Sequence, residues 1–492
     1  MLSHPWAERL GLAAMLLGTF AARAWRADQP ILENYVGRQV PTAMVAGNLA
    51  RGSGFLAPQL DTGPFPNLFL VEPPVSAQLV AWTSGATGLP LDPTGRLLSA
   101  AATTLAAWSL HALARRRGGP TVGFATLVAF ATFPVTLRYG RAFQPDPTAM
   151  ALVLAGLAAL DRGSRTAWVL GWTLLGLGIA QKVTWAFALV PALFALGGKS
   201  TVSRRVAPAV LAMIPALAWY LLVSLALVDG PSGSATSADN AANWLARLAP
   251  TSFLDARRFA IVGRDLFVRS FTPLGSLLFA FGIARSRGAD PLWRWWTIAA
   301  GLALVVLFGK LHHDYYWLML APPAAGWVGI AAGRLAERSR PLAAGVLAAL
   351  AALGIFQSRS TWATPREWRD APELARAIRK NVPVDALVIA PEAVIYLGGR
   401  RGCRLEYDGA GAVRAANEWR PTPPYVEADP SSLVRFYRTR AGARYYADVD
   451  LGPEDPTRRR LREAVLVEPS ARVIEDRPGR YLIVAFDDPV VP

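Results

Sequence analysis

The chain contains a single cysteine, Cys403, and only four histidines: His4, His111, His312 and His313. One cysteine excludes an internal disulfide, whatever the compartment. Zinc and related metals are held in proteins largely by cysteine and histidine side chains. The scarcity of both residue types therefore argues against a metal centre built mainly from them.

Charged residues are also few. They make up 17% of the chain, below the roughly 25% of ordinary soluble domains, whereas hydrophobic residues make up 53% and the mean hydropathy is +0.28. This balance is typical of an integral membrane protein. The net charge of +16 would suggest nucleic-acid binding in a soluble protein. Because much of it lies in short clusters between apolar runs, as in cytoplasmic membrane loops, we expect no nucleic-acid partner.

Apolar runs recur from residue 10 to about residue 356 and predict about eleven transmembrane helices. Several are shorter than the roughly 20 residues of a full span. The predicted segments are 10–25, 95–114, 120–138, 147–160, 166–180, 183–198, 207–228, 271–285, 295–309, 316–333 and 341–356. The first lacks a clean A-x-A cleavage site, so we interpret it as a retained helix rather than a signal peptide.

Basic clusters fix the orientation of these segments. With the N-terminus in the cytoplasm, every short inner turn carries arginine or lysine, as the positive-inside rule requires. The clusters are residues 115–117, Arg162 with Arg165, Lys199 with Arg204 and Arg205, Arg285 with Arg287 and Arg294, and Arg334 with Arg338 and Arg340. The long segments 26–94, 229–270 and 357–492 are then predicted to lie outside.

The composition changes after about residue 357. The stretch "EWRDAPELARAIRKNVPVDALVIAPEAVIYLGGR" predicts an amphipathic helix followed by a strand, and "RYLIVAFD" predicts another strand. We therefore expect a mainly α, polytopic membrane domain over residues 1–356, whose outer loop 26–94 carries juxtamembrane helices. A soluble, extracytoplasmic α/β domain is expected over residues 357–492.

Placing an ionisable side chain at membrane depth costs free energy, so such residues mark candidate functional sites. In "RYGRAFQPDPTAM", 14 residues separate Asp146 from the cytoplasmic Asp161. As a helix they rise about 21 Å, less than the roughly 30 Å hydrocarbon core. Asp146 is therefore expected below the outer lipid surface, near Arg138 and Arg141. The alternative is a simple helix cap at Asp146.

Two further outer turns carry buried polar candidates. "GLGIAQKVTWAF" offers Lys182 as a cation for a lipid phosphate, or as a lysine that snorkels to the interface. "GKLHHDYYWLML" offers Lys310, His312 and His313 as a phosphate-binding wall. Its aromatic residues, Tyr315 among them, could equally form an interfacial belt.

The first outer loop adds the acids Glu33, Asp61 and Glu72 and the base Arg38. Carboxylates that face cations in a lipid-accessible cavity suit group transfer from a lipid phosphate. One carboxylate would take the proton of an acceptor hydroxyl. Cations, or a divalent metal, would stabilise the departing phosphate.

The order of these motifs resembles the polytopic glycosyltransferases of the dolichyl-phosphate-mannose protein mannosyltransferase and lipid A aminoarabinose transferase superfamily. Its bacterial members carry "E-x-x-R-Q-A-D-T-A-x-x-A-R-N" after the first helix, and "ENYVGRQVPTAMVAGN" is similar. Residues 57–61 resemble "Y-P-Q-x-D", residues 71–74 "E-K-P-P", and "RYGRAFQPDP" and "HHDYYWLMLAPP" the later loops. Pro41 stands where the first motif has aspartate, and Gly47 where it has a basic residue.

This resemblance implies a GT-C fold and an inverting transferase that uses a polyprenyl-phosphate sugar. It would act at the outer face of the bacterial cytoplasmic membrane on a lipid, glycan or protein acceptor of the cell envelope. Glu33 is implied as the catalytic or metal-binding carboxylate, with Asp146 and Glu72 in the same pocket. Magnesium or manganese at Glu33 and Asp146 stays an option. The remaining candidates are Lys182, Lys310, Arg38 and Arg141 for the donor phosphate, and Gln39, Asp61, His312, His313 and Tyr315 for the substrate pocket.

Two other functions stay open on the sequence alone. A membrane transporter or lipid flippase would show inverted repeats with interrupted helices, and the chain shows no such symmetry. A non-catalytic scaffold would depend on residues 357–492 for partner binding.

Overall fold

The computed structural model describes residues 5–196, 203–223, 253, 255–285, 290–450 and 455–487. Most of the predicted outer segment 229–270, together with Lys199 and Arg287, lies outside the described residues. Within them the chain forms two compact units. Among the described residues, the helical unit contains residues 5–29, 86–196, 203–221, 253, 255–285 and 290–363; the mixed unit contains residues 30–85, 222–223, 364–450 and 455–487.

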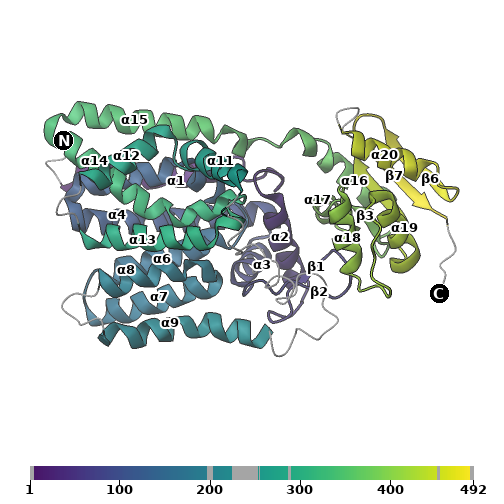
Figure 1. The fold of residues 1–492 in the computed structure, drawn as a ribbon, viewed down its shortest axis with the longest axis horizontal. Helices are drawn as coiled ribbons and strands as arrows, with labels where there is room; N and C mark the ends of the chain where they lie inside the picture. Colours follow the sequence, from purple (N-terminus) through teal and green to yellow (C-terminus); the bar gives the residue numbers. More distant parts are fainter. Residues whose placement is uncertain are drawn as a thin grey trace. The chain divides into compact units, whose positions relative to one another are not determined.

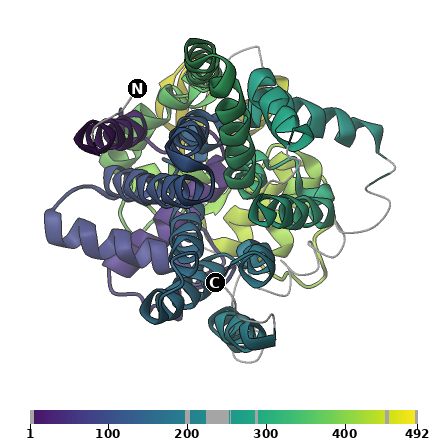
Figure 2. The same ribbon diagram turned by 90° about the vertical axis from the view of Figure 1, so that its left-hand side faces the viewer.

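The helical unit is built from apolar helices, and Figure 1 shows the longer ones side by side, while Figure 2 shows several of them end on. In chain order they are α1 (Pro5–Ala24), α4 (Leu91–Thr132), α5 (Pro134–Tyr139), α6 (Asp146–Leu160), α7 (Arg165–Gln181), η1 (Val183–Ala188), α8 (Leu189–Phe194), α9 (Ser203–Leu222), α11 (Ala256–Arg264), η4 (Asp265–Ser270), α12 (Pro273–Ala284), α13 (Pro291–Val306), η5 (Phe308–Lys310), η6 (Asp314–Met319), α14 (Ala321–Arg338), α15 (Arg340–Gln357) and η7 (Arg359–Trp362).

Within the described residues, the predicted membrane segments overlap these helices, while residues 197–198 and 224–228 of two segments lie outside that part. Segments 95–114 and 120–138 meet inside α4, where Gly119 has φ +83° and Pro120 follows. That backbone conformation favours glycine, and the predicted inner turn lies there. Among the described residues, three helices are long and apolar enough to cross a membrane, or four if the bent pair Ala256–Ser270 and Pro273–Ala284 is one span. The figure of about eleven spans stays a prediction.

The mixed unit joins the first outer loop to the C-terminal part of the chain. It contains α2 (Val36–Ala50), β1 (Gln59–Leu60), β2 (Asn67–Leu68), α3 (Val75–Thr87), η8 (Arg366–Trp368), α16 (Ala371–Asn381), β3 (Val388–Ala390), α17 (Glu392–Gly398), β4 (Gly402–Arg404), α18 (Gly409–Asn417), α19 (Pro430–Ala441), β5 (Tyr445–Val449), α20 (Pro456–Leu466), β6 (Ala471–Arg477) and β7 (Tyr481–Phe486). The backbone N–H of Gly402 donates to Asp61 O at 2.9 Å, and that of Gly63 to Gly402 O at 2.8 Å. Residues 26–94 were expected to belong with residues 1–356, and these bonds instead attach part of that loop to β4.

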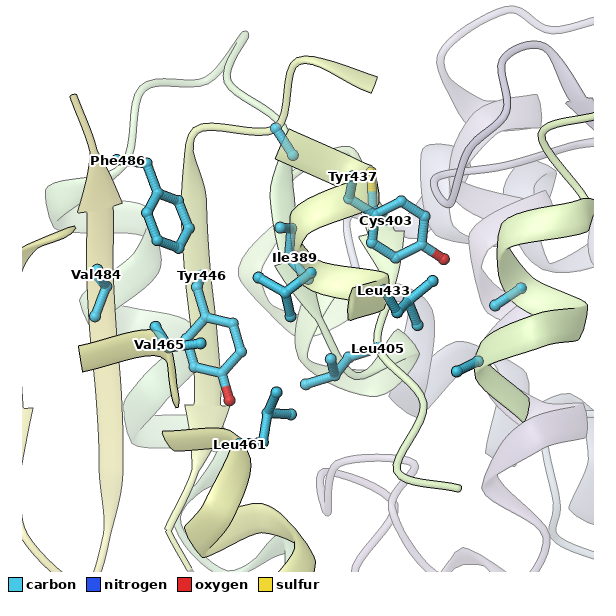
Figure 3. Packing of buried hydrophobic residues seen from close by; sticks show 14 of the residues in the cluster. Ile389, Cys403, Leu405, Leu433, Tyr437, Tyr446, Leu461, Val465, Val484 and Phe486 are labelled. Carbon is cyan, nitrogen blue, oxygen red and sulfur yellow. The ribbon is translucent and has the colours of Figure 1, made fainter. Parts of the chain in front are cut away.

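A five-stranded sheet of order β4-β3-β5-β7-β6 forms the centre of the C-terminal part. Strands β4, β3 and β5 are parallel, and β7 and β6 are antiparallel. Leu482, Val484 and Phe486 alternate along β7 and belong to one hydrophobic cluster, and Figure 3 shows Val484 and Phe486 in it. All six residues of β7 are buried, so both faces of this strand are covered. Residues of α18, α19 and α20 complete the cluster on one face.

Asp448 is a buried acid at the end of β5, 4% exposed, whose carboxylate accepts a hydrogen bond from the Tyr407 hydroxyl at 2.6 Å. Burial raises the pKa of Asp448 to about 6, while Arg458 and the hydrogen-bond donors act in the opposite direction. A raised carboxyl pKa means that the folded state binds the proton more tightly than the unfolded state. Its stability contribution is therefore complete below the ordinary pKa of 3.8 and is lost as the pH rises through about 6.

The Asp448→Asn variant is expected to remove this dependence. Between about pH 4 and pH 7.5, the wild type should lose up to roughly 3 kcal/mol relative to the variant, because each pKa unit corresponds to about 1.4 kcal/mol. Thermal unfolding of both proteins across that range measures the difference. A constant gap between the two melting temperatures would contradict the prediction.

Candidate active site

Close packing of α6 against α7 positions the first two site residues. A Cβ atom at Gly156 would lie 2.8 Å from Gly171 O, and one at Gly178 would lie 2.7 Å from Val153. Only glycine allows the two backbones to approach this closely. The two helices follow each other along the chain, so the first residue of α6, Asp146, meets the chain just after α7, at Lys182.

Asp146 and Lys182 form a buried ion pair. The Lys182 Nζ atom lies 2.6 Å from Asp146 Oδ2, and the side chains of Lys182 and Asp146 are 8% and 4% exposed. The same Nζ atom lies 4.7 Å from the centroid of the Tyr315 ring, a cation–π distance. Asp146 is thus more than a helix cap, because its carboxylate holds a cation from the next turn.

Asp314 is the centre of a second buried cluster, which adjoins the first through aromatic rings. The Tyr139 ring packs edge-on against Tyr315, with centroids 5.9 Å apart, and its hydroxyl donates to Asp314. Arg138 Nη1 lies 2.6 Å from the Asp314 carboxylate, and Arg269 lies at 4.0 Å. Arg138 also donates to the Arg269 carbonyl. Two carboxylates and several cations are therefore connected around Tyr139 and Tyr315.

The predicted histidine turn reaches this cluster through one ring. His313 stacks on Tyr315, with centroids 5.7 Å apart and an interplanar angle of 10°. His312 lies on the exposed side of the turn, with its ring centroid 3.8 Å from that of His313. Lys310 is 6% exposed at the end of η5.

The structure thus brings together Asp146, Lys182, His313 and Tyr315. Sequence reasoning left out Arg138, Tyr139 and Asp314 as site residues. Arg138 and Asp314 are 176 residues apart, so no local pattern pairs them. The sequence did show one charged residue in each of these two apolar turns. This pattern marks both turns as candidate sites, but it does not show that the two charges pair with each other.

Arg141 is hydrogen-bonded to three backbone carbonyls. Its guanidinium donates to the backbone carbonyls of Thr361 at 2.7 Å and of Trp25 and Arg26 at 3.0 Å, and its side chain is fully buried. These bonds connect the end of α1 to η7. Arg141 therefore has a structural role in the fold, and its predicted phosphate contact stays a prediction.

The first-loop candidates lie in the mixed unit. Glu33 is 1% exposed, and its backbone carbonyl accepts a hydrogen bond from Gln39 Nε2 at 2.8 Å. Arg38 forms an ion pair with Glu72, and its guanidinium lies 5.3 Å from the centroid of the Phe69 ring. The predicted acid Glu72 and the predicted cation Arg38 are thus partners of each other.

Asp61 is held by contacts within the first outer loop, and its predicted place in the substrate pocket stays a prediction. Its carboxylate accepts hydrogen bonds from Asn48 Nδ2 at 3.2 Å and from Arg51 at 2.8 Å. Asn48 also donates to Gln59 O at 2.9 Å. Asp61 therefore connects the end of α2 to the residues of β1. This connection requires a carboxylate acceptor directly after β1.

No group of three His, Cys, Asp or Glu side chains suited to a metal ion occurs within the part of the chain that the structure describes.

Residues 72–228, roughly a third of the chain, match the family model described as "Dolichyl-phosphate-mannose-protein mannosyltransferase". No curated protein sequence matches the chain. The matched region includes Glu72, Asp146 and Lys182 and ends before the Asp314 turn.

Several solved membrane enzymes share the fold. ArnT from Cupriavidus metallidurans, bound to undecaprenyl phosphate, is 14% identical, with a TM-score of 0.66 and coverage of 98% of each chain. An oligosaccharyltransferase from Archaeoglobus fulgidus is 12% identical, with a TM-score of 0.53 over 89% of this chain and 67% of its own. The arabinofuranosyltransferase AftD from Mycobacteria is 15% identical, with a TM-score of 0.56 over 99% of this chain and 40% of its own. The resemblance to this superfamily is thereby confirmed, and the fold is that of a multi-pass membrane protein.

Proposed function

We propose that the chain transfers a sugar from a polyprenyl-phosphate donor to a lipid, glycan or protein acceptor at the outer face of the bacterial cytoplasmic membrane. The buried Asp146–Lys182 pair carries the proposal, because a cation held in an apolar bundle suits a lipid phosphate. The fold shared with ArnT, which was solved with undecaprenyl phosphate, supports it.

The reaction would be a single displacement with inversion at the anomeric carbon. The acceptor oxygen forms a bond to that carbon, and the bond from the carbon to the phosphate oxygen breaks. The phosphate leaves with the electron pair and is stabilised by cations such as Lys182. A carboxylate takes the proton of the acceptor.

Glu33 is our first candidate for that carboxylate. It is buried, and the resemblance of "ENYVGRQVPTAMVAGN" to the first motif of the superfamily supports this choice. Glu72 is the other candidate, but its carboxylate is already paired with Arg38 in the structure.

Loss of the protein is expected to remove one sugar from an envelope component. Mass spectrometry of glycolipids and glycoproteins from cells with and without the protein should show one species lighter by a hexose or a pentose. The polyprenyl-phosphate sugar should accumulate, because its consumption has stopped. Complementation with Glu33→Gln should fail, whereas Glu72→Gln should retain part of the activity. Unchanged masses in the deleted strain would refute the proposed transfer.

A further inference from the structure

A small pocket in the mixed unit has no part in the proposed transfer. It has a volume of about 10 Å³, enough for one hydroxyl-sized group, is open to solvent, and is lined by Tyr446, Asp448, Val449, Asp450, Arg458, Arg462 and Leu482. Arg458 and Arg462 come from α20, and Tyr446 and Asp448 from β5. Figure 3 shows the Tyr446 hydroxyl directed toward the side of the core where Leu461 of α20 lies.

The acceptors in this pocket are largely satisfied within the protein. Asp448 accepts hydrogen bonds from the Tyr407 hydroxyl at 2.6 Å, the Val449 N–H at 2.8 Å and the Tyr446 hydroxyl at 3.3 Å. Asp450 accepts one from the Gly479 N–H at 2.9 Å. A carboxylate offers about four lone-pair sites, so Asp448 keeps room for about one more donor.

The donors are not satisfied. Among the described residues, Arg458 Nε, Arg458 Nη1 and Arg462 Nη1 are buried without a hydrogen-bond partner. Each has a carboxylate nearby, at 3.4, 3.9 and 3.4 Å respectively, but without the geometry of a hydrogen bond. Buried guanidinium N–H groups without acceptors are costly. A ligand that supplies oxygen acceptors would remove this cost.

Arg458 is also held in a fixed orientation. Its guanidinium carbon lies 4.2 Å from the centroid of the Tyr407 ring and 5.8 Å from that of Trp368. Its side chain is 11% exposed. A guanidinium that packs close to aromatic rings loses little conformational freedom on binding.

The charge balance selects the class of ligand. Four carboxylates pair with the two arginines: Asp448, Asp450, Asp455 and Asp476. The excess of negative charge disfavours a phosphate or a carboxylate, because like charges repel at these distances. A hydroxyl group is neutral, its oxygen accepts from the guanidinium, and its hydrogen donates to a carboxylate.

We propose that this pocket binds the hydroxyl-bearing edge of one sugar unit of a glycan. The pocket is a carbohydrate subsite composed only of residues from the mixed unit. The inference does not depend on the proposed transfer, since binding is measured without a donor.

The test uses the full-length protein in detergent and the methyl glycosides of glucose, galactose, mannose and arabinose as probes. Saturation-transfer NMR is expected to show contact with at least one of them. Arg458→Met should weaken that binding at least about tenfold, the loss expected for a hydrogen bond to a charged group. Arg459→Met is the matched control, because Arg459 is the next residue of α20 and its side chain is 63% exposed.

A second variant covers a failure of Arg458→Met to fold. Arg458→Lys keeps the charge and most of the stem but loses the Nε–H group and the planar fork, so it should also bind the glycoside more weakly. Three results would overturn the proposal: no transfer signal from any glycoside, equal binding by both Arg458 variants and the wild type, or inorganic phosphate binding more tightly than every glycoside.

Discussion

Replacing Asp146 by asparagine is expected to lower the rate of sugar transfer at least about 100-fold. The substitution keeps the shape of the side chain but removes the charge that holds Lys182 at 2.6 Å. Loss of one preorganised electrostatic group in a buried site typically costs a factor of about 10²–10³. Transfer from the lipid-linked donor in reconstituted vesicles measures the effect.

The ion pair also contributes to folding, and its two roles can be separated. Removing one charge leaves the other buried and unpaired, which typically costs about 3–5 kcal/mol. The double variant Asp146→Asn/Lys182→Gln removes both charges, so it should regain much of the lost stability while transfer stays low. Glu337→Gln is the control, because the Arg334–Glu337 pair is 54% and 63% exposed. Full transfer by the double variant would mean that the pair has no part in the reaction.

How far the sequence predicts this molecule depends on whether a feature is local. Helix positions follow from apolar runs, and even the break in α4 at Gly119 was expected from the basic cluster before it. The position of Asp146 below the outer lipid surface was predicted from the short length of the helix that begins at Asp146. Its pairing with Lys182 depends on three glycines that bring α6 and α7 together, and polarity alone does not indicate that approach.

Features that join distant parts of the chain were not predictable. The bond between Asp61 and Gly402 attaches the first outer loop to a strand more than 300 residues later. Arg141 carries the same kind of signal as Arg138, a charge in an apolar turn. Arg141 nevertheless donates to backbone carbonyls, whereas Arg138 pairs with a carboxylate and also donates to a carbonyl. A buried charge indicates that a partner exists, and only the fold shows which partner it is.

The Asp314→Asn variant is expected to destabilise the helical unit by roughly 3–5 kcal/mol, since Arg138 would keep its buried charge without a counterion. The Tyr139 hydroxyl would also lose its charged acceptor. Thermal unfolding in detergent, beside the exposed-pair variant Glu337→Gln, measures the change in stability.

Arg138→Met combined with Asp314→Leu tests what the cluster is for. Apolar residues of similar size often replace a buried ion pair at no cost in stability. If the cluster only stabilises the fold, the double variant should unfold near the wild-type temperature and still transfer sugar. We expect the stability to return and the transfer to stay low, because Tyr139 and Tyr315 connect Asp314 to the Asp146–Lys182 pair. Recovery of both properties would restrict the active site to Asp146, Lys182 and their immediate neighbours.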